Sequence, residues 1–250
     1  MIKNFDKVIV NALDYEDLKV FATALLMALE DGKNFIFRSA ASFVKVIGGV
    51  PDRPLLSRDD LIKERVSSGG LVVVGSHVNK TTEQLKQLEG IEDVTMIEFN
   101  QHLATNPPLL DQEVERAITA CESILSSGRT AVVYTRRKRF DLNINDKEAE
   151  LKMAVRISEA LTKIVANIKV RPSFIIAKGG ITSSDIGIKG LGVKRATVVG
   201  QIRPGIPVWF TGEESRFPKI PYVIFPGNVG KPEDLRYIVE ILMKGEMRCS

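Results

Sequence analysis

Cysteine, tryptophan and long apolar runs are scarce in this sequence of 250 residues, and each shortage excludes a class of protein. The two cysteines, Cys121 and Cys249, form no CxxC pair and no set with metal-ligand spacing, which argues against a disulfide framework and for a reducing compartment. No apolar run approaches the ~18 residues of a membrane span, and the first residues lack the apolar core of a signal peptide. These absences predict a soluble, cytoplasmic protein.

The excess of positive charge is also small. Lysine and arginine number 35 against 31 aspartate and glutamate residues, a difference of 4. This small excess is compatible with phosphorylated ligands, but it is lower than the net positive charge of a dedicated DNA-binding domain. The basic run at residues 136–139 is interpreted as a solvated loop, so we expect neither a nucleic acid nor a membrane as partner.

Short apolar runs rich in β-branched residues alternate with longer segments of helical period, which is typical of an α/β protein. Several of these runs are continuously apolar, so a wound, mostly parallel sheet with helices on both faces is predicted. We expect one nucleotide-binding domain over residues 1–250, with a small subdomain of about the first 50 residues as the alternative; residues 48–54 are the weakest join. The predicted strands are residues 8–10, 35–37, 71–74, 94–99, 131–134, 174–177, 196–199, 208–210 and 222–225.

Helix boundaries are predicted from capping residues and glycine stops. Cys121 falls on the apolar stripe of one of these helices and is interpreted as core, not as a nucleophile. The predicted starts and stops are Asp14 to Gly32, Thr81 with Gln84 in capping-box spacing to Gly90, Asp111 to Gly128, Asp146 to Ile168, and Pro232 to Gly245.

Three predicted strands run directly into glycine-rich loops. The first loop begins Gly75-Ser76-His77; it resembles a P-loop, but the second glycine before Lys80-Thr81 is missing, so a Walker A motif is rejected. A glycine, a hydroxyl and free amides at a helix start suit an anionic oxygen. A plain capped turn is an equally good interpretation of this loop alone.

The second loop carries the strongest phosphate signal in the chain. In Lys178-Gly179-Gly180-Ile181-Thr182, adjacent glycines tolerate positive φ and leave amides unshielded, and Thr182 is predicted to cap the next helix.

The third loop, residues 226–232, has Gly227 and Gly230 on either side of Asn228; Lys231 is interpreted as solvated. Because the carboxyl ends of parallel strands share one edge of a sheet, the three loops together predict a nucleotide site.

These residues resemble the four-carbon acid sugar kinases, and in particular their C-terminal nucleotide-binding domain. The matching features are Gly75-Ser76 with Thr82 and Gln84, the loop at residues 178–182, and Pro-Gly-Asn-Val-Gly at residues 226–230. A weaker match covers Asp14 to Leu18 and Phe37 to Ala41, so that the resemblance extends over nearly the whole chain.

The resemblance implies an enzyme that phosphorylates a four-carbon sugar acid with ATP and Mg²⁺. It implies that the nucleotide contacts are Ser76, Gly179, Gly180, Ile181, Thr182 and Gly227, with Asn228 and Gly230 shaping the last loop. Thr182 would touch phosphate or metal-bound water. Ile181 stands where the family often has an acidic residue, which removes one polar contact but leaves the backbone cradle.

The family's N-terminal sugar-binding motif, Ala-Asp-Asp-x-Thr-Gly, is absent from this sequence. The first hypothesis is therefore an ATP-binding half of a kinase that is inactive without an N-terminal substrate domain, with no catalytic base assigned. The second hypothesis is a non-catalytic module that holds a nucleotide or phosphate as a regulatory ligand. A Rossmann oxidoreductase is disfavoured because no GxGxxG follows the first strand. The sequence is compatible with a homo-oligomer, and His77 and Trp209 are interpreted as solvent-facing and core, respectively.

Overall fold

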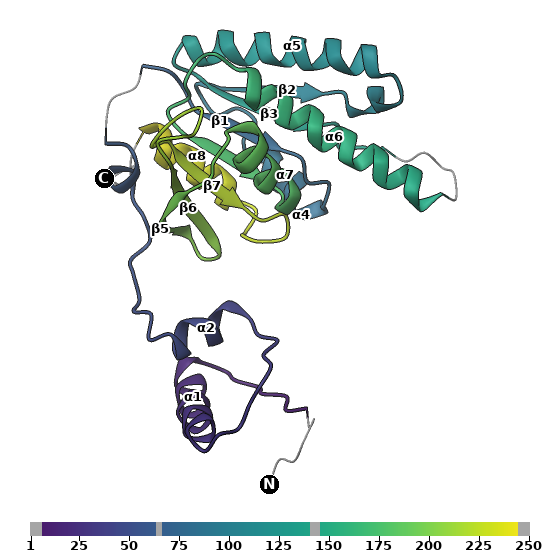
Figure 1. The fold of residues 1–250 in the computed structure, drawn as a ribbon. Helices are drawn as coiled ribbons and strands as arrows, with labels where there is room; N and C mark the ends of the chain where they lie inside the picture. Colours follow the sequence, from purple (N-terminus) through teal and green to yellow (C-terminus); the bar gives the residue numbers. More distant parts are fainter. Residues whose placement is uncertain (1–6, 64–66, 141–145, 245–250) are drawn as a thin grey trace. The chain divides into compact units, whose positions relative to one another are not determined.

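The computed structural model describes residues 7–63, 67–140 and 146–244, and it divides the chain into two compact units between Arg53 and Pro54 (Figure 1). This division falls at the end of the segment 48–54, the weak join of the sequence. Cys249 and the glycine stop at Gly245 lie outside the described residues.

In the first unit, the described residues 7–53 form the helices α1 (Tyr15–Glu30) and α2 (Ala41–Ile47). Asp14 caps α1 as predicted, because its carboxylate accepts from the backbone N–H groups of Glu16 and Asp17 at 2.9 and 3.1 Å. The ring of Phe43 on α2 lies 5.7 Å from that of Phe21 on α1. This aromatic contact joins the two helices.

Two predicted strands of the first unit, residues 8–10 and 35–37, are not strands in the structure. The central side chain of each run faces solvent, with Ile9 88% and Ile36 fully exposed, while Phe35 is half-buried. A strand is stable only where a neighbour satisfies its backbone N–H and C=O groups, and the described residues of this unit supply no such neighbour. The prediction of strands at residues 8–10 and 35–37 is therefore wrong, because these runs have no pairing partner among the described residues.

The second unit is built on a seven-stranded sheet in the order β2-β3-β1-β4-β7-β6-β5. The five strands from β2 to β7 in this order pair in parallel, whereas β6 is antiparallel to both β7 and β5. The predicted mostly parallel α/β fold is thus confirmed. The strands are β1 (Leu71–Val74), β2 (Val94–Phe99), β3 (Thr130–Thr135), β4 (Ile175–Lys178), β5 (Ala196–Arg203), β6 (Ile206–Thr211) and β7 (Pro221–Phe225).

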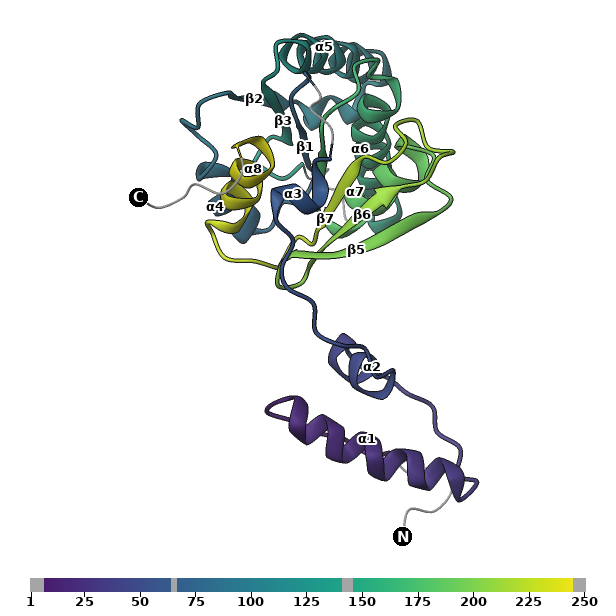
Figure 2. The same cartoon turned by 90° about the vertical axis from the view of Figure 1, so that its left-hand side faces the viewer.

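Helices cover both faces of this sheet (Figure 2). On one face, α5 and α6 pack against Leu71 and Val73 of β1, and on the other, α4 and α8 pack against Val72 and Val74. All four β1 side chains are fully buried, which explains why this strand is a continuous apolar run rather than an alternating one.

Several helices begin at other residues than the capping pattern predicts. The helix expected to begin at Asp111 begins at Pro107 with Asn106 as its cap, because prolines favour the first turn. Asp146 caps the following helix as predicted, and the last helix begins two residues after Pro232. The helices of this unit are α3 (Arg58–Leu61), α4 (Asn79–Lys86), η1 (Gln101–Thr105), α5 (Pro107–Ser126), α6 (Lys147–Asn167), α7 (Gly180–Asp185), η2 (Ile186–Gly190) and α8 (Asp234–Lys244).

Among the described residues, none of the helices combines the length and apolarity that crossing a membrane requires.

The two apolar cores of the second unit contain only residues after position 54. We therefore expect residues 54–250, expressed alone, to fold and to unfold cooperatively at the temperature of the full chain, because no core contact is removed. Circular dichroism during thermal unfolding measures this. A broad, non-cooperative transition in the shortened chain would show that the first unit contributes to the fold of the second.

Candidate functional site

The three glycine loops of the sequence follow three neighbouring strands. β1, β4 and β7 lie side by side and parallel, so the loops after them lie at one edge of the sheet (Figure 1). From β1 the chain moves to β2 and β3 on one side and then crosses to β4 on the other. Wound sheets bind ligands in the crevice that such a reversal opens at the strand ends.

Ser76, Gly179 and Gly227, one from each loop, lie against one another. A Cβ atom on Gly227 would stand 2.9 Å from Ser76 Oγ and 4.0 Å from Gly179 Cα. Gly179 has a φ of +124°, and its N–H donates to the Phe225 carbonyl at 2.9 Å. Glycine is therefore required at 179 by the backbone conformation, whereas a side chain at 227 would force the Ser76 hydroxyl to move.

Thr81 joins the first loop to the third and does not cap a helix as predicted. α4 begins at Asn79, and its capping residue Val78 makes no side-chain hydrogen bond to the helix. The buried Thr81 hydroxyl lies 3.1 Å from Ser76 Oγ and donates to the Gly227 carbonyl at 3.2 Å. The Thr81 side chain therefore makes a tertiary contact and does not cap the helix.

Gln84, the other half of the expected capping box, is also a tertiary contact. Its fully buried amide donates to the carbonyls of Val229 and Lys231 at 3.3 and 2.9 Å. In the same loop, Gly230 has a φ of +85°, and Asp234 accepts from the Lys231 N–H at 2.7 Å. These bonds hold the third loop against α4.

The second loop leads into α7 at Gly180. A Cβ atom on Gly180 would meet no atom within 4 Å, and Ile181 is 74% exposed, so this part of the loop faces open space. Thr182 is not the predicted cap: Gly179 occupies the capping position, and Thr182 lies inside the first turn, 8% exposed. Its Oγ1 lies behind the loop, where a Cβ atom on Gly75 would approach it to 2.2 Å.

Two lysines lie beneath and beside these loops. Lys178 is fully buried, its Nζ donates to the Pro226 carbonyl at 3.0 Å, and it lies 3.8 Å from the centre of the Phe225 ring. Lys80 donates to the carbonyl of the exposed Asn228 at 3.2 Å. Burial, with a smaller effect of the Lys80 charge, lowers the pKa of Lys178 to about 7.

Arg137 is a residue of this edge that the sequence interpretation assigned to a solvated loop. It follows β3, and its Nε and Nη2 donate to the Thr82 hydroxyl on α4 at 3.2 and 3.0 Å. The side chain is half-buried, and burial lowers the pKa of the guanidinium. The sequence could have indicated this role, because Arg137 comes directly after an apolar strand. The end of that strand lies at the same edge of the sheet as the glycine loops.

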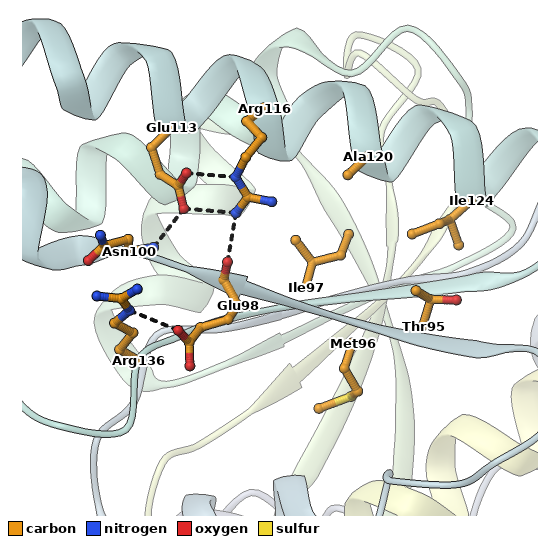
Figure 3. Close-up of a pocket in the computed structure, with 10 residues that line it drawn as sticks. All are labelled: Thr95, Met96, Ile97, Glu98, Asn100, Glu113, Arg116, Ala120, Ile124 and Arg136. Atoms are coloured by element: carbon orange, nitrogen blue, oxygen red, sulfur yellow. Dashed lines mark hydrogen bonds and ion pairs between the residues drawn. The ribbon is translucent and has the colours of Figure 1, made fainter.

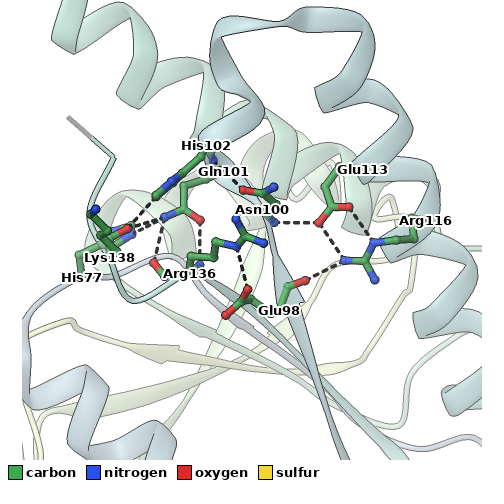
Figure 4. Close-up of polar contacts among 9 residues, drawn as sticks. All are labelled: His77, Glu98, Asn100, Gln101, His102, Glu113, Arg116, Arg136 and Lys138. Atoms are coloured by element: carbon green, nitrogen blue, oxygen red, sulfur yellow. Dashed lines mark hydrogen bonds and ion pairs between the residues drawn. The ribbon is translucent and has the colours of Figure 1, made fainter. Parts of the chain in front are cut away.

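His77 was also interpreted as solvent-facing, but it is half-buried in a polar network (Figure 4). Its Nε2 lies 3.3 Å from the amide nitrogen of the fully buried Gln101, which also donates to the Arg136 carbonyl at 2.9 Å. Burial, followed by the nearby charge of Arg137, lowers the pKa of His77, so the neutral imidazole is favoured.

Of the two side chains that the sequence assigned to the core, Cys121 lies in it, and Trp209 is half-buried and packs against it. Cys121 on α5 is fully buried, and burial raises the pKa of its thiol to about 12, so it is no nucleophile. The ring of Trp209 lies 6.1 Å from that of Tyr222 and packs against the core.

A groove of about 490 Å³ runs between β2 and α5, away from the glycine loops (Figure 3). Its charged side chains are paired with each other: Arg116 with Glu113 at 2.7 Å and Arg136 with Glu98 at 2.8 Å. The groove therefore offers an anionic ligand no uncompensated charge.

The sequence of residues 71–235 matches the family model of the nucleotide-binding C-terminal domain. This match spans more than half of the chain, from β1 into α8, and includes all three glycine loops. The chain belongs to this family. No curated protein matches it.

Three solved structures have a similar fold. A protein from Salmonella typhimurium LT2, described as a candidate tRNA synthase, has a TM-score of 0.60 and 14% identity over 91% of this chain and 51% of its own. A domain of unknown function 1537 from Bordetella bronchiseptica, described with bound citrate as a domain-swapped dimer, has a TM-score of 0.55 and 16% identity, covering 93% and 52%. A Haemophilus influenzae protein of the same family model has a TM-score of 0.52 and 19% identity, covering 93% and 52%.

At these identities the likeness shows the fold alone. This chain spans about half the length of the solved chains that it resembles.

The buried Lys178 generates a prediction for stability. The unfolded lysine keeps its proton up to its ordinary pKa of 10.5, whereas the folded one loses it above about 7. Between these values the unfolded state binds more protons, so this group makes the free energy of unfolding rise with pH, by up to ~1.4 kcal/mol per pH unit. Lys178→Met removes this rise.

Urea unfolding at pH 7, 8 and 9 measures the slope. The exposed Lys86, at the end of α4, gives the matched control Lys86→Met, which should keep the slope of the parent chain. Equal slopes for Lys178→Met and the parent would contradict a depressed pKa at Lys178.

Proposed function

Because the chain belongs to the family of nucleotide-binding C-terminal domains, we propose that it binds ATP with Mg²⁺ at the loops after β1, β4 and β7. The observation that supports this most is the convergence of the three glycine loops at the point where the strand order reverses. In this proposal the chain is the nucleotide-binding half of a four-carbon acid sugar kinase.

We assign the phosphate contacts to the part of the second loop that faces open space. The backbone N–H groups of Gly180 and Ile181 start α7, where the first amides of a helix have no partner within it. Ser76 adds a hydroxyl, and Gly227 allows the third loop to approach. Thr182 lies behind the loop, so we assign it a supporting role instead of a contact with metal-bound water.

The charges around the loops favour an anion. Within the described residues, Lys80, Lys178 and Arg137 all donate to neutral oxygens and have no carboxylate partner. The carboxylate of Asp185 is instead bound to Ser158 and Lys189 at 2.7 and 3.0 Å. Lys80 and Arg137 therefore leave positive charge at this edge uncompensated until an anionic ligand arrives, and Lys178, whose pKa is about 7, adds to this charge only when it is protonated.

The side chains that could act as metal ligands also indicate how Mg²⁺ would be held. The part of the chain that the structure describes contains no group of three or more His, Cys, Asp or Glu residues able to hold a metal. Mg²⁺ commonly enters such sites on the phosphates of a nucleotide and keeps several waters. We propose that it arrives with ATP, where it neutralises the charge that develops during phosphoryl transfer.

In the proposed reaction the terminal phosphoryl group of ATP passes to a hydroxyl of a four-carbon sugar acid. The residues of this chain hold and orient the nucleotide, and the base that accepts the hydroxyl proton comes from the substrate domain. The second candidate, a non-catalytic nucleotide-binding module, has the same loops and differs only in the absence of turnover.

Titration calorimetry with ATP and Mg²⁺ tests the binding site, with NADH as the control ligand. We expect saturable binding of ATP and none of NADH. Gly180→Val should weaken ATP binding at least ~10-fold, because the new side chain would project into the phosphate cradle at a position where the protein itself leaves room.

Ala154→Val, an exposed position on α6, is the matched control for a bulkier helical side chain and should bind ATP like the parent chain. Unchanged ATP affinity in a folded Gly180→Val variant would remove the phosphate site from this loop.

Kinase activity is tested by adding the separately produced N-terminal domain of a four-carbon acid sugar kinase. ATP-dependent phosphorylation of a four-carbon sugar acid should occur only with both polypeptides present. ATP binding without phosphorylation would favour the non-catalytic module.

A further inference from the structure

Residues 7–53 carry the pattern of a strand, a helix and a second strand, but they contain no sheet. The apolar runs at 8–10 and 35–37 flank the well-capped helix α1, which is the order of a parallel β–α–β unit. Parallel strands occur in sheets that are covered on both faces. A pair of strands with one helix does not complete such a sheet.

The side chains of this unit are exposed to a degree that a finished fold would not leave. Ile9 is 88% exposed, and Leu13 and Ile36 are fully exposed, whereas Phe35 is half-buried and the ring of Phe37 lies 5.5 Å from that of Phe43. On α1, only Ala22 and Leu25 are buried. Further apolar residues of α1 remain exposed, among them Val20, Leu26, Met27 and Leu29.

This exposed surface is apolar, and among the described residues of the unit neither extended run is paired in a sheet. A polypeptide of about 50 residues cannot bury enough apolar surface to be stable in this form. An edge strand of a parallel sheet supplies both requirements at once, since it pairs with the backbone and offers apolar side chains on two faces.

The comparisons show how much of this chain, and of two similar structures, is matched. Residues 54–250 are 197 of 250, about 79% of the chain, but the Bordetella and Haemophilus structures match 93% of it. Segments of the first unit therefore have counterparts in those proteins, whose chains are about twice as long. About half of each of those chains is not matched by this sequence.

We propose that residues 7–53 dock onto a second domain outside this sequence and complete its β-sheet, with residues 8–10 and 35–37 as added parallel strands and α1 on one face. The domain onto which they dock has a parallel sheet with an exposed edge strand and apolar surface around that edge. This inference rests on the proposed function in one respect, because it identifies that domain with the sugar-acid-binding domain of the kinase. The first unit then belongs to the substrate domain, and residues 54–250 hold the nucleotide.

The test uses the full chain and, as the probe, the half of the Haemophilus influenzae protein that this chain does not match. Sedimentation velocity should show a one-to-one complex. Amide hydrogen exchange at residues 8–10 and 35–37 should be fast in the free chain and slow in the complex, because strand pairing protects the backbone.

The double variant Ile9→Asp, Ile36→Asp places a charge on each added strand and should weaken the complex at least ~10-fold. Asn11→Asp, Asn34→Asp adds the same charge at exposed polar positions of the same unit and should bind the probe like the parent chain. ATP affinity should be equal in all three proteins, so that a failure of docking is distinguished from a failure of the nucleotide site.

Three results would overturn the proposal. The first is the absence of a complex, and the second is a complex that the isoleucine variant leaves intact. The third is a dimer of the free chain that the isoleucine variant dissociates, which would identify a second copy as the occupant.

Discussion

The close approach of three parallel strand ends is the constraint from which the candidate site follows. β1, β4 and β7 are hydrogen-bonded neighbours, so the loops after them approach one another closely, and a Cβ atom on Gly227 would stand 2.9 Å from Ser76 Oγ. Gly179 and Gly227 fit this close approach, and Thr81 and Gln84 then tie the first and third loops together through α4. Amides and hydroxyls of three distant segments reach one place because the sheet sets their positions before any ligand binds.

Burial of positive charge is the second organising feature of this edge. A fully buried lysine destabilises a fold unless its polar head has a partner, and Lys178 has a carbonyl and an aromatic ring in place of a carboxylate. Among the described residues, Lys80 and Arg137 also bond only to neutral oxygens, so they leave this edge with an uncompensated positive potential, to which Lys178 adds when it is protonated. In the chain's family of nucleotide-binding domains, such a potential matches the charge of the ligand.

The sequence predicted most strands and the mostly parallel sheet, because continuous apolar runs between helical segments have few other solutions. The sequence-based predictions were wrong where one residue type can have either of two roles. Thr81, Gln84 and Thr182 have the composition of helix caps, but their side chains make tertiary contacts or lie behind the loop. A hydroxyl or amide near a helix start can cap it or bond to a distant segment, and local spacing does not distinguish the two. Residues 8–10 and 35–37 failed for a related reason, since strand pattern specifies a side-chain arrangement but not a partner.

By itself, therefore, the sequence determined the fold class, the three glycine loops and their order along the chain, because each depends on local periodicity and backbone freedom. Only the tertiary structure decided that the loops meet, that Lys178 is buried beneath them, and that Arg137 and His77 belong to the same edge. Those facts depend on strand order, which joins residues more than 100 positions apart. Strand order is set by how the two faces of the sheet bury their helices, a property of the whole unit that no local segment records.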